Sequence, residues 1–288
     1  MTLFALLIVL AIEFHFKLGS EYRKFDWFEK MIGFFKGWLE DKEFYQSWWQ
    51  VGIVLLTPLV ALIAITNPFD GFMYELIILL VAIPLLFFSL GPNSLEQSFA
   101  EYFAAMERDD TEAALLHLTQ IGSASETDDA AVLEKDELVR HATQKILTEA
   151  QKRYFGPIAW FIFVGPFGAL FYRLCHQYGN YCQKNKLQEQ HRLTQKVIHW
   201  IEWIPSRLTS LLFLLTGDFV KGFHPIQDYA LDAEADSNRL VSETGIAALG
   251  LDRGISDDTN EENYRASEIV TRTVIFYLVL AAIVSTLL

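Results

Sequence analysis

Apolar blocks of nearly membrane-spanning length alternate with charged segments along this chain. A membrane helix needs about 20 mostly apolar residues, and five or six blocks approach that length: residues 2–16, 48–66, 72–90, 155–175, 200–216 and 269–288. No segment shows the two-residue alternation that is typical of strands. The pattern therefore predicts an all-α, polytopic membrane protein with four to six membrane-embedded helices and additional helical cytoplasmic segments.

The polar segments between these blocks predict helices of other kinds. Residues 17–47 place aromatic side chains at helical spacing opposite charged ones, which predicts an amphipathic connector on the membrane surface or packed on the bundle. Residues 91–154 predict a soluble helical insertion with a helix pair, in which Thr111 caps the second helix. Residues 217–268 predict an acidic, soluble helical segment in which Gly250 ends a helix.

Helix-breaking residues interrupt the fourth and fifth apolar blocks. Gly165, Pro166 and Gly168 lie in the fourth block and Pro205 lies in the fifth, which suits broken helices. We expect these two blocks to be re-entrant or packed inside the fold. The distribution of lysine and arginine agrees with this interpretation. One full crossing would place the basic residues 176–199, as a loop, on the side of the membrane opposite to the other basic segments.

Composition narrows the class of protein further. The chain is 52% hydrophobic, has a mean hydropathy of +0.22 and carries a net charge of −13, so nucleic acid is not expected as a partner. The first block lacks the basic start and the cleavage pattern of a signal peptide, and we expect it to be retained. Cys175 and Cys182 are expected to be free thiols, since a disulfide would need an oxidising compartment. No zinc-ligand spacing, P-loop or nucleophile elbow occurs, so we expect no metal and no cofactor.

Two arginines lie in or beside apolar blocks, where a charge needs a partner or a water-filled site. Arg173 ends the fourth block and Arg207 lies inside the fifth. These arginines either bind an anionic ligand or pair with Glu202, Glu149 or helix-end carbonyls and hold the helices together. Arg173 can also extend from its helix end to the membrane surface.

Two sequence stretches resemble a known superfamily. GPIAWFIFVGPFGALFYR at residues 156–173 and WIPSRLTSLL at residues 203–212 resemble the CobD/CbiB and AmpE inner-membrane proteins. SETGIAALG at residues 242–250 resembles a further stretch of that superfamily, one residue shorter. The first apolar block and the short overall length are most similar to AmpE. The resemblance implies one integral membrane domain over residues 1–288.

For the CobD/CbiB branch, the resemblance implies an enzyme that joins aminopropanol, or its phosphate, to a corrinoid carboxyl group. That branch carries asparagine and aspartate where this chain has His176 and Gly179. Its DDxxN pattern falls on Ile198, His199 and Glu202 here. A site that handles activated phosphates needs such acids or a charge clamp. The replaced carboxylates therefore argue against enzymatic activity on a retained scaffold.

The resemblance to AmpE implies a multi-pass sensor or signalling modulator of the bacterial inner membrane, linked to peptidoglycan recycling, β-lactamase regulation and antibiotic resistance. The implied partners are the lipid bilayer, an AmpD-like amidase or a cell-wall fragment, and a second copy of the chain. An amide-forming synthase and a transporter or lipid-handling protein remain as alternatives. The candidate ligand-binding residues are Glu149, Tyr172, Arg173, His176, His199, Glu202, Arg207 and Glu243.

Overall fold

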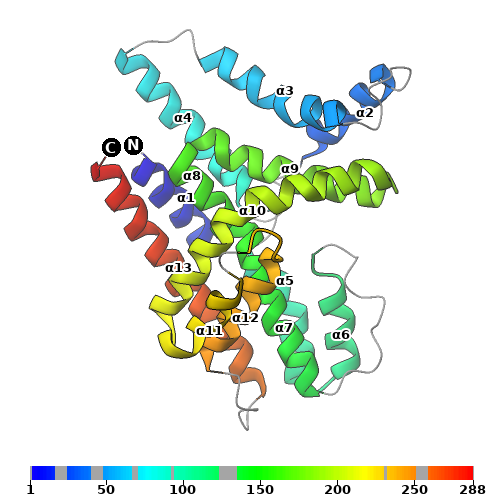
Figure 1. Cartoon of the computed structure of the whole chain (residues 1–288), viewed down its shortest axis with the longest axis vertical. Coiled ribbons are helices and arrows are strands. Elements are labelled where there is room, and N and C mark those ends of the chain that lie inside the picture. The colour runs from blue at the N-terminus through cyan, green and yellow to red at the C-terminus, as the bar shows by residue number, and fades with distance from the viewer. Residues whose placement is uncertain are drawn as a thin grey trace. The chain divides into compact units, whose positions relative to one another are not determined.

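Helices make up all the regular structure in the described part of the chain, which confirms the predicted all-α class (Figure 1). The computed structural model describes residues 2–16, 25–39, 48–66, 71–91, 94–122, 135–229, 232–250 and 259–287. The sequence NPFDG at residues 67–71 predicts a turn, and the polar sequence GSASETDDAA at residues 122–131 predicts a loop. Both segments lie mostly outside these ranges. The chain forms two compact units, and each unit combines separate stretches of sequence.

The first unit contains the described residues of Met1–Pro92, Gly156–Glu202 and Leu280–Leu288. Its helices are α1 (Thr2–Phe16), α2 (Asp26–Leu39), α3 (Trp48–Thr66), α4 (Gly71–Ser89), α8 (Gly156–Val164) and α9 (Pro166–Lys184), followed by the first part of α10 (Gln188–Thr216). Helix α9 contacts α3, α4 and α8, so it is the central element of this unit.

The core of the first unit explains the pattern of the amphipathic helix α2. Phe25, Phe28 and Ile32 are buried and belong to the same apolar cluster as Val51 of α3 and Tyr172 of α9. Phe25 directly precedes α2, and the three residues recur at three- and four-residue spacing, which places them on one face of the helix. Helix α2 therefore packs through this face on the helices of its own unit.

A glycine separates α8 from α9, as the sequence predicts. Gly165 has φ +84° and ψ −163°, a backbone region that is open essentially to glycine alone. Pro166 then occupies the first turn of α9, where its missing N–H costs no hydrogen bond. A side chain at Gly168 would lie 2.8 Å from the Trp160 carbonyl oxygen, so glycine also allows the close packing of α8 and α9.

Two expectations for the neighbouring segments are wrong. Residues 176–199 do not form a loop, because α9 continues to Lys184 and α10 begins at Gln188. Their lysine, arginine, glutamine and leucine residues are good helix formers, and this propensity outweighs the appearance of a polar linker.

The second wrong expectation is a break in the fifth apolar block. Helix α10 runs without interruption from Gln188 to Thr216 with Pro205 inside it. Proline cannot donate to the carbonyl four residues earlier, which here belongs to Ile201. The Trp160 indole Nε1 donates to that Ile201 oxygen at 2.9 Å. A tertiary hydrogen bond thus replaces the helical one that Pro205 removes.

The second unit contains the described residues of Asn93–Phe155 and Trp203–Val279. Its helices are α5 (Leu95–Glu107), α6 (Thr111–Thr119), α7 (Lys135–Ala150), a π-helical turn η3 (Gln151–Phe155), the second part of α10, α11 (Phe219–Tyr229), α12 (Ser237–Leu249) and most of α13 (Thr259–Leu287). Helix α7 contacts α5, α6 and α12, and α11 packs on α12.

Helix ends in the second unit largely follow the sequence signals. The predicted pair is present as α5 and α6, and Ser94 and Gln97 form a capping box at the start of α5. The cap of α6 is Asp110 and not Thr111, because the Asp110 carboxylate accepts from the Ala113 N–H at 3.0 Å. Gly250 ends α12 in the left-handed conformation at φ +77°, as predicted.

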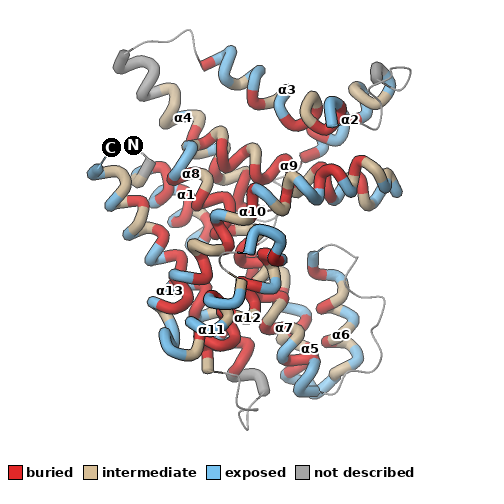
Figure 2. The backbone as a smooth tube through the Cα atoms, viewed as in Figure 1, coloured by how far each residue is buried: buried red, intermediate tan, exposed pale blue. Residues whose placement is uncertain are grey.

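Among the described residues, two helices are long and apolar enough to cross a membrane, Trp48–Thr66 and Glu262–Leu287. Two shorter helical stretches, Leu3–His15 and Ile77–Ser89, are also apolar. Exposed positions recur along α3 (Figure 2), and they include Leu56, Val60 and Ile65. Such a large exposed apolar surface is typical of a lipid-facing helix or of an interface.

Candidate functional site

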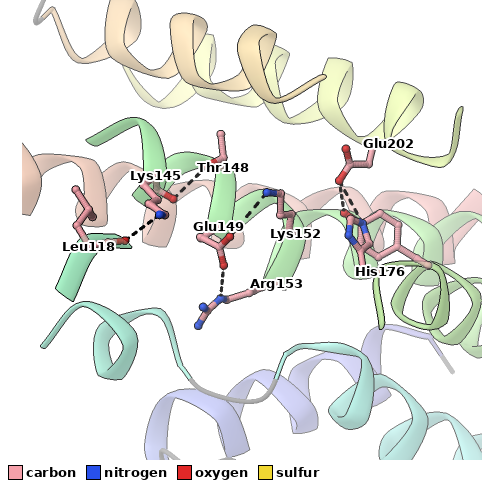
Figure 3. A network of polar contacts seen from close by, with 9 residues as sticks. Leu118, Lys145, Thr148, Glu149, Lys152, Arg153, His176 and Glu202 are labelled. Atoms are coloured by element: carbon pink, nitrogen blue, oxygen red, sulfur yellow. Dashed lines mark hydrogen bonds and ion pairs between the residues drawn. The ribbon is translucent and has the colours of Figure 1, made fainter. Parts of the chain in front are cut away.

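Three of the candidate residues come together in the first unit as a buried polar cluster, here called the Tyr172–His176–Glu202 cluster. Tyr172 and His176 lie one turn apart on α9, and their rings are 4.6 Å apart. The Tyr172 hydroxyl donates to Glu202 Oε1 at 3.3 Å. His176 Nε2 lies 3.2 Å from the same oxygen, and Figure 3 shows the two side chains pointing toward each other.

The contact between His176 and Glu202 is electrostatic more than directional. Nε2 makes no well-oriented hydrogen bond although the carboxylate is close, so the pair is an ion pair when the imidazole is protonated. Glu202 is 4% exposed and Tyr172 is fully buried. A buried carboxylate without partners is costly. The tyrosine and the histidine of α9 therefore help to hold the Glu202 carboxylate of α10 inside the fold.

A glycine at the start of α8 makes room for this cluster. A Cβ atom on Gly156 would lie 2.2 Å from Cζ and 2.3 Å from the hydroxyl oxygen of Tyr172. Both distances are far below van der Waals contact. Gly156 opens the GPIAWFIFV stretch that carries the superfamily resemblance, so this part of the motif has a direct geometric link to the candidate site.

Arg173 has one of the partners that the sequence left open for it, a helix-end carbonyl group. It is 5% exposed, and its Nε donates to the carbonyl oxygen of Ser89 at 2.6 Å. Ser89 is the last residue of α4, where the carbonyl groups lack helical donors and carry partial negative charge. Arg173 therefore ties α9 to the end of α4 through a helix-end carbonyl.

Glu149 lies in a separate network in the second unit, which includes Lys145, Lys152 and Arg153 and is here called the Glu149 network. Glu149 accepts from Arg153 Nε at 3.0 Å, and Lys152 Nζ lies 3.8 Å from its other oxygen (Figure 3). Lys145 donates to the Leu118 carbonyl at 2.8 Å. Sequence reasoning missed these cations as partners, although their three- and four-residue spacing on a helix was a signal.

The charge of this network sets the protonation of Glu149. Burial raises the pKa of Glu149, but Arg153, Lys152 and Lys145 together outweigh burial and hold that pKa below its ordinary value. Gly122 lies against the carboxylate, since a Cβ atom there would be 2.9 Å from Glu149 Oε1. With φ +85°, this position also favours glycine for its backbone alone. Glu149 is thus an ionised, structurally enclosed carboxylate.

The other candidates have local partners. The Arg207 guanidinium lies 4.5 Å over the Trp203 ring and donates to the Asp232 carbonyl at 2.7 Å. Glu243 pairs with Arg239 on the surface of α12 at 2.7 Å. The His199 ring lies 5.7 Å from that of Trp200. The role of all these residues in ligand binding stays a prediction.

The described ranges contain no evident metal-binding site. They contain no group of three or more histidine, cysteine, aspartate or glutamate residues that could hold a metal ion. Cys175 and Cys182 are both buried and free. The cluster in the first unit holds the Glu202 carboxylate next to a tyrosine and a histidine, and the Glu149 network holds one carboxylate among three cations.

Comparisons with known proteins place these features in a family context. A family model described as "Regulatory signalling modulator protein AmpE" matches residues 1–288. The chain is also 24% identical over 178 residues to the cobalamin biosynthesis protein CobD of Chromobacterium violaceum, which covers 61% of this chain and 56% of the relative. The chain therefore spans little more than half the length of that curated relative. No solved structure matches the chain.

Proposed function

Because this chain belongs to the AmpE family, we propose that it acts as an inner-membrane signalling modulator linked to cell-wall recycling and β-lactamase regulation. The observation that carries the proposal is the match of the family model over the whole chain. The two apolar helices of spanning length support a membrane location. We extend this location to a multi-pass arrangement in which the shorter apolar helices are also embedded.

The signal is proposed to pass through the Tyr172–His176–Glu202 cluster. In the absence of ligand, the Glu202 carboxylate contacts Tyr172 and His176. An anionic ligand, such as the carboxylate of a cell-wall fragment, takes its place and displaces Glu202 from these two residues. Displacement would change the contact between α9 and α10, since these polar groups link the two helices. A ligand shifts such an equilibrium only by its differential affinity for the two states. The proposal therefore requires the ligand to bind better when Glu202 has moved away.

Replacing Glu202 with glutamine is expected to alter β-lactamase induction. The amide keeps the size of the side chain but loses the carboxylate charge that lies next to Tyr172 and His176, so the displaced state gains population. Bacteria that lack the chromosomal copy would be complemented with the variant, and β-lactamase activity would be measured with and without a β-lactam inducer. Glu189→Gln is the matched control, because Glu189 is a partly exposed residue paired with Arg192.

The signalling role is contradicted if Glu202→Gln and Glu189→Gln both match the wild type at equal protein levels. Alkaline carbonate extraction of the same cells checks the location, because an integral membrane protein stays in the membrane pellet. Release of the wild-type protein into the soluble fraction would contradict the membrane assignment.

The similarity to CobD favours one second candidate, an amide-forming enzyme of the cobalamin pathway. The replaced carboxylates at Gly179, Ile198 and His199 argue against it. His176 and Glu202, at two asparagine positions of that branch, contact each other. We expect no product when the purified protein is incubated with cobyric acid, aminopropanol phosphate and ATP. Formation of the amide, and its loss in Glu202→Gln, would favour the enzyme over the modulator.

A further inference from the structure

A cavity of about 410 Å³ lies within the second unit, and none of the eight candidate residues lines it. The end of α10, the start of α11, the end of α12 and the first part of α13 surround it. It is lined by Thr216, Gly217, Asp218, Lys221, Ala248, Leu249, Gly250, Arg265, Glu268, Ile269 and Arg272. Its volume lies in the range of small-molecule sites, which is about 300–1,000 Å³.

Among the described residues that line this cavity, positive charge is in excess. Lys221, Arg265 and Arg272 face two carboxylates, those of Asp218 and Glu268. The Lys221–Asp218 pair is loose at 3.7 Å, and the Arg272–Glu268 pair at 3.0 Å is well exposed. Exposed pairs of this kind contribute little stability and are readily exchanged for another anion.

Arg265 provides the strongest reason to expect an anion. Its Nη2 donates to the Leu249 carbonyl oxygen at 3.0 Å, which fixes the guanidinium at the edge of the cavity. Among the described residues, no carboxylate forms an ion pair with it. A guanidinium has five donors in a fixed fork, so several remain for a phosphate or carboxylate.

The backbone groups around the cavity are compatible with a bound anion. The carbonyl groups that end α12 are already engaged, because Ala247 accepts from the Gly250 N–H at 2.9 Å and Ala248 accepts from the Asp218 N–H at 2.7 Å. Gly250 also leaves space for the lysine, since a Cβ atom there would lie 3.1 Å from Lys221 Nζ. The first turn of α11 adds the positive end of a helix dipole.

We propose that this cavity binds a phosphate group through Lys221, Arg265 and Arg272. The phosphate belongs to a soluble phosphorylated compound or to a lipid headgroup. Residues 273–287 of α13 contain no charge and follow directly after Arg272. Arg272 therefore lies where an apolar membrane segment begins, which favours a site at the level of the lipid headgroups. This site is independent of the Tyr172–His176–Glu202 cluster and of the signalling role proposed for it.

Binding to the full-length protein tests the proposal in two arms. Inorganic phosphate is titrated into protein held in nanodiscs of phosphatidylcholine, and short-chain phosphatidylglycerol is titrated against short-chain phosphatidylcholine into protein in a neutral detergent. Saturable binding of inorganic phosphate indicates a soluble ligand. Preference for phosphatidylglycerol alone indicates a headgroup. We expect Arg265→Gln and Arg272→Gln each to weaken the binding about tenfold, the effect of losing one charge-assisted contact.

Two further variants keep the test independent of folding. Glu268→Gln frees Arg272 and should strengthen binding, a gain that unfolding cannot produce. Arg239→Gln removes an exposed arginine of the same unit that does not line the cavity, and it should leave binding unchanged. The proposal is overturned if neither probe binds saturably, or if the three cavity variants bind like Arg239→Gln.

Discussion

Replacing Glu149 with alanine is expected to destabilise the second unit by about 3–5 kcal/mol, the usual cost of removing one partner from a buried charged network. Glu149 is 6% exposed, and Lys145 is equally buried. Without the carboxylate, the charges of Arg153, Lys152 and Lys145 repel one another in a poorly solvated place. The measurement is thermal unfolding of the purified full-length protein in detergent, followed by circular dichroism.

Glu189→Ala is the matched control for this prediction, because it removes a partly exposed glutamate that also pairs with an arginine on its C-terminal side. Exposed pairs of this kind are worth about 0–1 kcal/mol. A melting temperature for Glu149→Ala that equals that of Glu189→Ala would show that the Glu149 network does not hold the unit together.

The same carboxylate predicts a pH dependence with a defined sign. The pKa of Glu149 in the folded protein is lower than its ordinary value of 4.5, so the unfolded chain binds the proton more readily. The stabilisation is therefore complete above pH 4.5 and is lost as the pH falls through the folded pKa. The difference in melting temperature between the wild type and Glu149→Gln should be constant above pH 4.5 and should shrink below it.

Replacing Gly156 with alanine is expected to disrupt the packing of α8 on α9. The new Cβ atom would lie 2.2 Å from the Tyr172 ring, and the fully buried ring has no open direction in which to move. Overpacking of a core costs about 1–3 kcal/mol and occasionally more. The displaced tyrosine would also leave Glu202, so signalling should fail together with stability.

Two variants separate this clash from a general effect of the substitution. Tyr172→Leu in the Gly156→Ala background removes the ring atoms that clash and should recover part of the melting temperature, but not the signalling. Gly52→Ala on α3 is the control, because a Cβ atom there meets nothing within 4 Å. That change should be neutral or stabilising, since alanine favours helix over glycine by about 1 kcal/mol. Equal melting temperatures for Gly156→Ala and Gly52→Ala would contradict the proposed clash.

Local patterns in the sequence were sufficient to predict the helical class and several helix ends. The apolar blocks, the helix pair α5 and α6, the break at Gly165 and the end of α12 at Gly250 all follow from spacing, composition or backbone preference. These features depend on residues close together in the chain. For the same reason, the stretches 156–173 and 203–212 were sufficient for the family assignment that the whole-chain match confirms.

The partners of the buried charges were decided by the tertiary structure. Glu202 contacts Tyr172 and His176, and the Arg173 guanidinium bonds the carbonyl oxygen of Ser89, across separations of 26 to 84 residues. The continuity of α10 through Pro205 likewise depends on the indole of Trp160, which supplies the hydrogen bond that the proline cannot make. A sequence pattern shows that a buried charge or a proline needs a partner. Only the packing of distant helices determines which atom becomes that partner.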